Sequence, residues 1–174
     1  GQALDKEFEN DLSITEEMYM DMVEKKTGAL LGASAALPAI YNGEKTKTLE
    51  SYEQYGRRLG MAFQIHDDLL EVTADKKTMG KSLGSDIAKG KQTIMAIKAR
   101  KKFPDQWSKL IENPNKPDSF KNICMFFKET GIIEETRLIA SSYFDSSLKC
   151  LENLNGINTN ELTQLVELIE KRTY

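Results

Sequence analysis

The residues best suited to chemistry lie in one stretch of the sequence, residues 60–93. Its three carboxylates are Asp67, Asp68 and Glu71. On a helix, residues four positions apart lie one turn apart on the same face, so Asp67 and Glu71 are expected to point the same way. Carboxylate oxygens are the ligands that hard divalent cations prefer, and such cations commonly bridge to phosphate. The spacing therefore predicts a divalent-cation site.

Two lysines follow the carboxylates, each directly after a glycine, at Lys81 and Lys91. Glycine supplies bendable backbone, and lysine supplies a fixed positive charge. A Gly-Lys pair alone is typical of a solvated loop, but beside carboxylates it favours a loop that folds over an anion. Carboxylates, a cation and lysines together suggest an oligophosphate ligand. Asp86 in the same loop either caps a following helix or pairs with a lysine, and both interpretations stay open.

The helix that must carry the carboxylates is expected from about residue 48 to beyond residue 71. Residues 60–70 are apolar around most of the helix circumference, which predicts burial. The polar exceptions form one narrow strip of side chains: Gln64, Asp67, Asp68 and Glu71. Buried carboxylates must be paired or bind metal, so this strip favours a site over a solvated face. His66 lies about 100° away round the helix and is expected to be packed or hydrogen-bonded.

Lys26 is a further candidate, on an earlier helix that Ser13 or Thr15 is expected to cap. It falls within an apolar stripe formed by Met18, Met22, Ala29, Leu30 and Ala33. An unpaired buried lysine is costly, so the simpler interpretation is that Lys26 snorkels to the surface. The functional interpretation is an ammonium that points into a polar cavity beside the Thr27 hydroxyl. Methionines 18, 22 and 61 are expected to fill the core.

Helical periodicity without strand alternation predicts an all-α fold, a helical bundle of one domain over residues 1–174. Pro38 and Asn42-Gly43 are expected to end the helix that carries Lys26. Residues 1–100 hold the motifs. Residues 101–174 are expected to pack as helices near residues 119–130 and 133–154, followed by one capped at Asn158 or Asn160. Trp107 is expected to be a packing residue, and Lys171-Arg172 a solvated chain end.

Composition excludes several classes of protein. The formal net charge is −3, and no basic run interleaved with aromatics is present, so nucleic acid is not an expected partner. Cys124 and Cys150 lack metal-ligand spacing and predict reduced, buried thiols in a cytoplasmic protein. The longest apolar run, residues 28–40, is shorter than the roughly 20 residues of a membrane span.

Several ordered motifs resemble those of one family. FQIHDDLLE, followed by GKSLGSD and GKQT, is similar to the second aspartate-rich region of trans-isoprenyl diphosphate synthases, the polyprenyl synthetase family. EEMYMDMVEKKTGALL resembles the family's Y-x-x-M-x-x-x-KT segment, with Lys26-Thr27 as the KT pair. GQALD at the start resembles its GQ-x-x-D element. The resemblance covers residues 1 to about 100 densely and the later helices only in pattern.

The resemblance implies roles for the metal-binding carboxylates. Asp67 and Glu71 would ligate Mg²⁺ that bridges to an allylic diphosphate, with Asp68 in support through water or hydrogen bonds. Glu71 stands where the family usually has Asp, which is one methylene shorter. That difference leaves a carboxylate in place but changes its reach.

The resemblance also implies the substrate contacts. Lys26, Lys81 and Lys91 would neutralise diphosphate oxygens, and Thr27 and Gln64 would line the pocket where the allylic cation develops. Gln2 and Asp5 would sit at the cavity edge. The implied reaction is ionisation of the allylic diphosphate, attack by isopentenyl diphosphate and loss of a proton, on an isoprenoid-synthase fold and usually in a homodimer.

The family's first aspartate-rich motif is not in these 174 residues. The chain is therefore interpreted as the C-terminal half of a synthase and is expected to be inactive alone. The alternatives are a non-catalytic subunit of a heteromeric synthase and a terpene cyclase or squalene-type synthase on a similar fold. A plain helical domain with a solvated acidic face is the remaining possibility.

Overall fold

The computed structural model describes residues 1–74, 89–112, 118–154 and 156–172. All regular secondary structure in these ranges is helical, which confirms the all-α prediction. The helices are α1 (Gln2–Glu7), α2 (Glu16–Val23), η1 (Glu24–Gly28), α3 (Ala29–Tyr41), α4 (Thr46–Thr73), α6 (Ile94–Lys102), α7 (Pro104–Ile111), α8 (Ser119–Glu129), α9 (Ile132–Glu152) and α10 (Asn160–Glu170).

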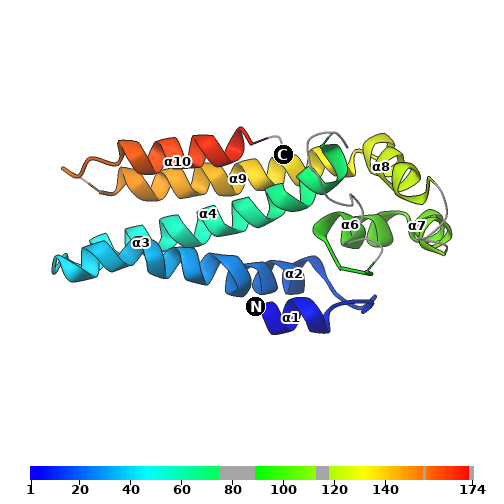
Figure 1. Ribbon diagram of the computed structural model, residues 1–174, viewed down its shortest axis with the longest axis horizontal. Helices are drawn as coiled ribbons and strands as arrows, with labels where there is room; N and C mark the ends of the chain where they lie inside the picture. Colours follow the sequence, from blue (N-terminus) through cyan, green and yellow to red (C-terminus); the bar gives the residue numbers. More distant parts are fainter. Residues whose placement is uncertain (75–88, 113–117, 155, 173–174) are drawn as a thin grey trace.

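Helix α4 is the central element of the fold. It packs along α3 on one side and along α9 on the other, and α10 lies over α9 (Figure 1). Helices α6, α7 and α8 gather at the end where α4 finishes. Two faces of α4 are therefore covered by different layers, and side chains one position apart on α4 meet different neighbours.

Glycines allow α4 to approach η1 and α3 closely. A Cβ atom on Gly60 would lie 2.7 Å from the Gly28 Cα, and one on Gly56 would lie 2.3 Å from the Leu31 carbonyl oxygen. Both separations are far below a van der Waals contact, so only glycine fits at these two positions of α4. The close approach brings Thr27, next to Gly28, against Gln64, one turn beyond Gly60.

The helix that carries Lys26 is continuous from Glu16 to Tyr41 but contains a π-helical turn, η1. Thr15 is its cap, because the Thr15 hydroxyl accepts a hydrogen bond from the Met18 amide at 3.2 Å. Pro38 does not end the helix as expected. The helix continues through Pro38 to Tyr41 and ends, as predicted, at Asn42-Gly43, where Asn42 is the C-cap and Gly43 has a φ of +69°.

The apolar stripe predicted around Lys26 is only partly buried. Met22 is 4% exposed and Met61 6%, but Met18 is 39% exposed and Leu30 70%. The prediction that all three methionines fill the core is therefore wrong for Met18. Leu30 follows the π-helical turn, which changes the angular spacing of the residues after it, and the 3.6-residue pattern could not anticipate this change.

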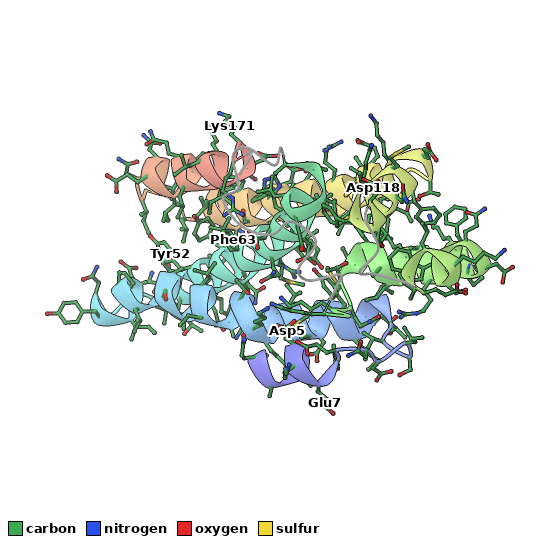
Figure 2. The ribbon with its side chains drawn as sticks, turned by 45° about the vertical axis from the view of Figure 1, so that its right-hand side comes forward. Asp5, Glu7, Tyr52, Phe63, Asp118 and Lys171 are labelled. Atoms are coloured by element: carbon green, nitrogen blue, oxygen red, sulfur yellow. The ribbon has the colours of Figure 1, made fainter. Side chains whose placement is uncertain are left out.

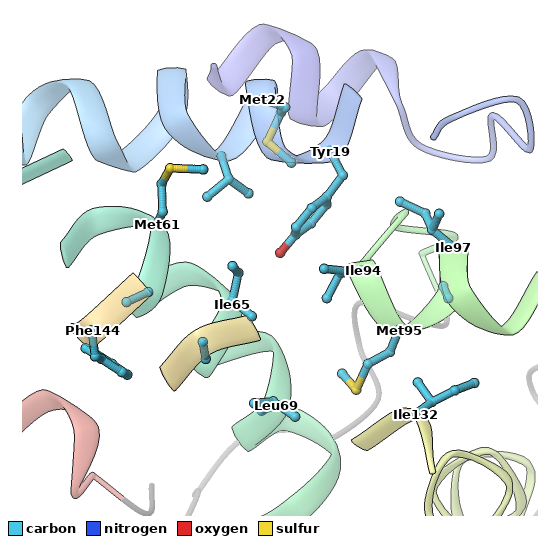
Figure 3. Packing of buried hydrophobic residues seen from close by; sticks show 14 of the residues in the cluster. Tyr19, Met22, Met61, Ile65, Leu69, Ile94, Met95, Ile97, Ile132 and Phe144 are labelled. Carbon is cyan, nitrogen blue, oxygen red and sulfur yellow. The ribbon is translucent and has the colours of Figure 1, made fainter. Parts of the chain in front are cut away.

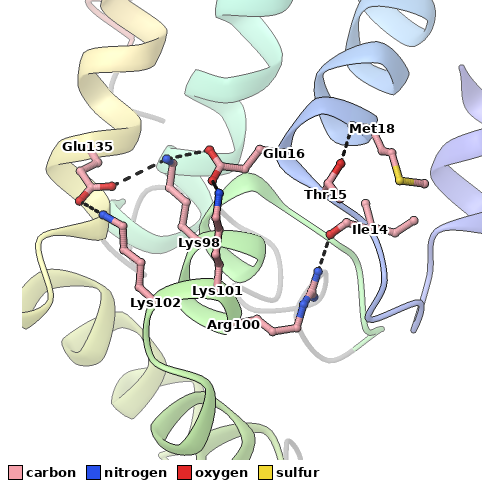
Figure 4. Close-up of polar contacts among 9 residues, drawn as sticks. All are labelled: Ile14, Thr15, Glu16, Met18, Lys98, Arg100, Lys101, Lys102 and Glu135. Atoms are coloured by element: carbon pink, nitrogen blue, oxygen red, sulfur yellow. Dashed lines mark hydrogen bonds and ion pairs between the residues drawn. The ribbon is translucent and has the colours of Figure 1, made fainter.

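Helix α6 is buried and carries a buried lysine, Lys98, that the sequence did not single out. Its Nζ atom lies 2.9 Å from a Glu16 oxygen on α2 and 3.7 Å from a Glu135 oxygen on α9 (Figure 4). Arg100 donates to the Ile14 carbonyl at 2.5 Å and to the Gln92 side chain at 2.6 Å. These contacts fix α6 against the start of α2.

The C-terminal helices pack as expected. Helices α8, α9 and α10 match the predicted segments, and α9 begins after Gly131 at a positive φ of +75°. Trp107 is buried and stacks on Phe127 with ring centroids 5.4 Å apart. Cys124 and Cys150 are not joined in a disulfide, as predicted, although both are half-buried instead of fully buried. In the part of the chain that the structure describes, no helix has the length and apolarity needed to cross a bilayer.

Candidate active site

A small cavity of about 20 Å³ lies where α1, α2, η1, α4 and the residues before α6 meet. Its lining brings together residues from widely separated parts of the sequence: Asp5, Tyr19, Met22, Lys26, Gln64, Asp68, Lys91, Gln92 and Thr93. The space suits about one water molecule, so the cavity is a tight polar junction. Predicted site residues from three separate motifs meet here.

Lys26 points into this junction. Its ammonium lies 2.8 Å from an Asp5 carboxylate oxygen, and the two side chains are only 20% and 18% exposed. Lys26 therefore reaches a paired position within the cavity, and the snorkelling interpretation is wrong. Figure 2 shows Asp5 turned toward α2, whereas Glu7 on the same helix points into solvent.

Asp68 is buried at 9% exposure and receives two hydrogen bonds. The Tyr19 hydroxyl donates to Asp68 Oδ2 at 2.8 Å, and Gln64 Nε2 donates to Oδ1 at 3.3 Å. Gln64 Oε1 in turn accepts from the Thr27 hydroxyl at 3.2 Å. Thr27 and Gln64, predicted as a pair, are in direct contact.

Burial raises the pKa of Asp68 to about 7. The charges of Glu71 and Asp67 act in the same direction, whereas the hydrogen bonds from Tyr19 and Gln64 oppose the shift. Desolvation and the neighbouring Asp68 charge also hold the pKa of Tyr19 well above its ordinary value, so this hydroxyl keeps its proton.

Asp67 lies on a different side of α4. Its side chain is 54% exposed, and its Oδ1 atom accepts a hydrogen bond from Arg172 at 2.6 Å. The Arg172 guanidinium also stacks over the Phe63 ring, 4.8 Å from its centroid. The expectation of one buried carboxylate strip is wrong for Asp67, and the expectation of a solvated chain end is wrong for Arg172.

His66 is packed and hydrogen-bonded, as predicted. Its Nε2 atom lies 2.9 Å from the Arg172 carbonyl oxygen, and its ring contacts Phe144 edge-on with centroids 5.9 Å apart. It also lines a larger cavity of about 530 Å³ between α4, α9 and the end of α10, together with Arg137 and Arg172. His66 thus holds the chain end that pairs with Asp67.

The carboxylates form no preassembled metal cluster. Within the described ranges, no three His, Cys, Asp or Glu side chains lie close enough to hold a metal ion. Asp67 and Glu71 are nonetheless oxygen donors one turn apart on a helix, and Asp67 is half-open to solvent. Protein-bound Mg²⁺ commonly takes one or two carboxylates and completes its shell with water and phosphate oxygens, so this pair fits such an ion.

The remaining predicted residues divide into three groups. Lys91 lines the small cavity with Lys26, whereas Gln2 is exposed on α1 and does not line it. Lys81 and Asp86 lie outside the described residues. Gln92 and Thr93 also line the cavity. They are the last two residues of the GKQT motif, but the sequence analysis assigned them no role.

The sequence marks Tyr19 only as part of a motif, and the structure gives it a definite contact. It comes from α2, and its hydroxyl points toward α4 among Met22, Ile65 and Ile94 (Figure 3). A usable signal was present, because Tyr19 precedes Lys26 by two helical turns and so shares its face. The fold and the site together define an all-helical protein in which lysines and carboxylates from separate motifs meet at one buried junction.

Comparison with known proteins agrees with this class. The Polyprenyl synthetase family model matches residues 1–126. The short chain isoprenyl diphosphate synthase of Methanothermobacter thermautotrophicus is 50% identical over 100% of this chain and 55% of its own length. The chain belongs to the polyprenyl synthetase family.

Two solved structures have the same fold. The geranylgeranyl pyrophosphate synthetase of the archaeon Geoglobus acetivorans aligns with a TM-score of 0.80 at 32% identity, over 98% of this chain and 52% of that one. A polyprenyl synthase from Caulobacter crescentus, complexed with calcium and isoprenyl diphosphate, aligns with a TM-score of 0.86 at 24% identity, over 99% of this chain and 55% of that one. The chain spans about half the length of the relatives it matches. These relatives carry synthase names, which gives no support to the alternative of a non-catalytic subunit.

Proposed function

We propose that the protein to which these 174 residues belong is a Mg²⁺-dependent prenyltransferase. It joins isopentenyl diphosphate to an allylic diphosphate and so makes a longer isoprenoid diphosphate. The observation that carries the proposal is one buried pocket of a polyprenyl synthetase chain that is lined by Lys26, Gln64 and Asp68, with the Thr27 hydroxyl bonded to Gln64. A relative of the same fold, solved with calcium and isoprenyl diphosphate, is consistent with a divalent cation and this substrate class.

Lys26 and Lys91 are proposed to bind the diphosphate. In the structure the Lys26 ammonium pairs with Asp5, and a diphosphate oxygen would compete with that carboxylate for it. Both partners are mostly buried, so the positive charge is held in place before substrate arrives. We extend the same role to Lys81, which lies outside the described residues.

Asp67 and Glu71 are proposed to hold Mg²⁺, and Asp68 supports them by fixing the helix surface between them. A bound Mg²⁺ would supply positive charge to a departing diphosphate. Thr27 and Gln64 then line the region where the allylic carbon becomes positive, and their oxygen atoms face positive charge favourably. Apolar neighbours such as Met22 keep water away from this carbon.

The test uses the complete reading frame that contains these residues. Purified protein is incubated with isopentenyl diphosphate, a labelled allylic diphosphate and Mg²⁺, and the products are separated by chain length. Elongated products that disappear with EDTA support the proposal, and hydrolysis alone or no reaction contradicts it. The Lys26→Met variant is the matched control, because it keeps the length of the side chain but removes its charge.

Two further expectations are kept as proposals. The 174-residue chain alone is expected not to elongate substrates, because its residues supply one carboxylate cluster of the two that the family uses; clear elongation by this chain would overturn that expectation. The full protein is expected to be a homodimer, and its mass in solution by light scattering tests this.

A further inference from the structure

Four side chains from three helical elements form one continuous chain of hydrogen bonds. The order is Tyr19 on α2, Asp68 and Gln64 on α4, and Thr27 on η1. The first three residues and Lys26, which neighbours Thr27, line the small cavity. The chain therefore joins a fully buried residue to the place where the substrate is proposed to react.

The orientation of the Gln64 amide sets the direction of these hydrogen bonds. The Tyr19 hydroxyl donates to Asp68 Oδ2, and Gln64 Nε2, an amide nitrogen that can only donate, donates to Asp68 Oδ1. The Gln64 amide nitrogen then faces Asp68, and its carbonyl oxygen faces Thr27. A carbonyl oxygen only accepts, so Thr27 must donate its proton toward Gln64.

That direction decides what Thr27 offers to a substrate. Because Thr27 donates its proton to Gln64, the Thr27 oxygen presents only lone pairs to its other neighbours. Lone pairs attract a carbon that is becoming positive, whereas a hydroxyl proton pointed at that carbon repels it. The orientation of the Thr27 proton thus decides whether the hydroxyl attracts or repels the reacting carbon.

We propose that Tyr19 is a positioning residue that sets this orientation: it holds Asp68, and through Asp68 and Gln64 it keeps the Thr27 hydroxyl an acceptor toward the substrate. This inference rests on the proposed function. Tyr19 does not touch the substrate in this scheme. Its effect reaches the reacting atoms through three hydrogen bonds.

Burial explains why a tyrosine stands at this position. Tyr19 is 2% exposed, and its ring packs among apolar side chains such as Met22 and Ile94 (Figure 3). A phenylalanine would fill the same space without a polar atom that needs a partner, so the hydroxyl is retained at a cost unless it is used. Its use is to supply one of the two donors that Asp68 receives.

Removal of the Tyr19 hydroxyl is expected to disturb the orientation of the Thr27 hydroxyl. Without the Tyr19 hydroxyl, Asp68 loses the shorter of its two hydrogen bonds, 2.8 Å against 3.3 Å, and with it the contact that ties it to α2. The Asp68 side chain can then turn away from Gln64, and the Gln64 amide loses the partner that fixes its orientation. In the turned-over amide the nitrogen donates to Thr27, whose proton is freed to point at the substrate.

The experiment is a double-mutant cycle in the complete reading frame, with Tyr19→Phe, Thr27→Val and the double variant. Tyr19→Phe is expected to lower kcat about 10-fold while KM for each diphosphate stays within about twofold. In the Thr27→Val background the same change is expected to cost less than about twofold, because there is no hydroxyl left to orient. Thr27→Ser is expected to restore the dependence on Tyr19.

Tyr55→Phe is the matched control. Tyr55 is also 2% exposed, and its hydroxyl donates to the Leu162 carbonyl at 3.0 Å, away from the cavity. It reports the stability lost with a buried tyrosine hydroxyl, and its kcat is expected to match wild type. Additive losses in the cycle, or an equal fall in kcat for Tyr55→Phe, would overturn the inference.

Neutron diffraction from deuterium-exchanged crystals tests the orientation without any need for turnover. At about pH 8.5, where carboxyl groups are ionised, the Thr27 deuteron is expected to point at Gln64 Oε1 in wild type. A deuteron directed into the cavity would refute the inference. If wild-type protein fails to elongate any allylic diphosphate, the proposed function is wrong, and the neutron result still decides the orientation.

Discussion

Asp67 and Asp68 are neighbours in the sequence but occupy opposite environments on α4. Asp68 faces α2, is 9% exposed and takes hydrogen bonds from Tyr19 and Gln64. Asp67 faces the end of α10, is 54% exposed and pairs with Arg172. One residue is enclosed by neutral donors, and the other is held by a charge at the edge of solvent.

This difference in exposure and pairing suits Asp67 and Asp68 to different roles. A half-exposed carboxylate whose partner is a single arginine can exchange that partner for a cation. A buried carboxylate with two neutral donors cannot do so without breaking an internal network. We therefore propose that Asp67, on the open side of α4, meets the ligand, and that Asp68, on the enclosed side, orders the pocket.

Asp67→Asn tests whether Asp67 holds the cation, and it is expected to have the largest effect on activity. The substitution keeps the size of the side chain but removes the charge that would hold Mg²⁺. We expect kcat in the complete reading frame to fall on the order of 10²–10³-fold, with little change in thermal unfolding, because Asp67 is half-exposed. Steady-state kinetics and calorimetry measure the two quantities.

Asp145→Asn is the control for that change, since Asp145 is an exposed aspartate on α9. It is expected to leave kcat at the wild-type value. An Asp67→Asn protein that keeps its activity would show that the open side of α4 does not carry the metal.

The sequence predicted which residues meet better than it predicted how they meet. The spacing of the motifs identified Lys26, Thr27, Gln64 and Asp68, and all four lie at one junction. The choice between a snorkelling and a cavity-bound Lys26 could not be made from periodicity, because it depends on Asp5 on another helix. Periodicity describes one helix at a time, whereas a partner comes from the packing of two.

The same limit explains the errors at Asp67 and Arg172. A strip of polar residues on a buried helix predicts a buried strip, but α4 is covered by different layers on its two sides. Arg172 reaches Asp67 across 105 positions of sequence, and no local pattern marks such a contact. The π-helical turn that carries Lys26 and Thr27 was equally invisible, since it alters the helical repeat over five residues only.

Asp68, on the enclosed side of α4, should make the free energy of unfolding depend on pH. Because the folded state raises the pKa of Asp68 to about 7, it binds this proton more tightly than the unfolded chain. Below about pH 4 both states are protonated, and between about pH 4 and pH 7 only the unfolded chain loses its proton. The free energy of unfolding should therefore fall as pH rises through this window, on the order of 2 kcal/mol.

Asp68→Asn cannot titrate and should lack this component. The measurement is chemical denaturation of both proteins in EDTA at about pH 4.5 and pH 7.5. The stability of wild type relative to Asp68→Asn is expected to be higher at the lower pH. An unchanged difference would mean that Asp68 is not buried as described, and Asp145→Asn reports the effect of losing an exposed carboxyl.

Arg172→Ala removes the partner of Asp67 and should have the smallest effect of these changes. The pair with Asp67 is half-exposed, so its loss is expected to cost only about 0.5 kcal/mol of unfolding free energy. Arg172 and a divalent cation compete for the same carboxylate, so its removal is expected to tighten Mg²⁺ binding about two- to fivefold at low salt. Isothermal titration with Mg²⁺ measures this affinity.

Lys171→Ala is the matched control, because Lys171 is the adjacent basic residue and pairs with Glu167 at 2.9 Å, away from Asp67. Weaker Mg²⁺ binding in Arg172→Ala alone would mean that Arg172 orients Asp67 for the cation and does not compete with it.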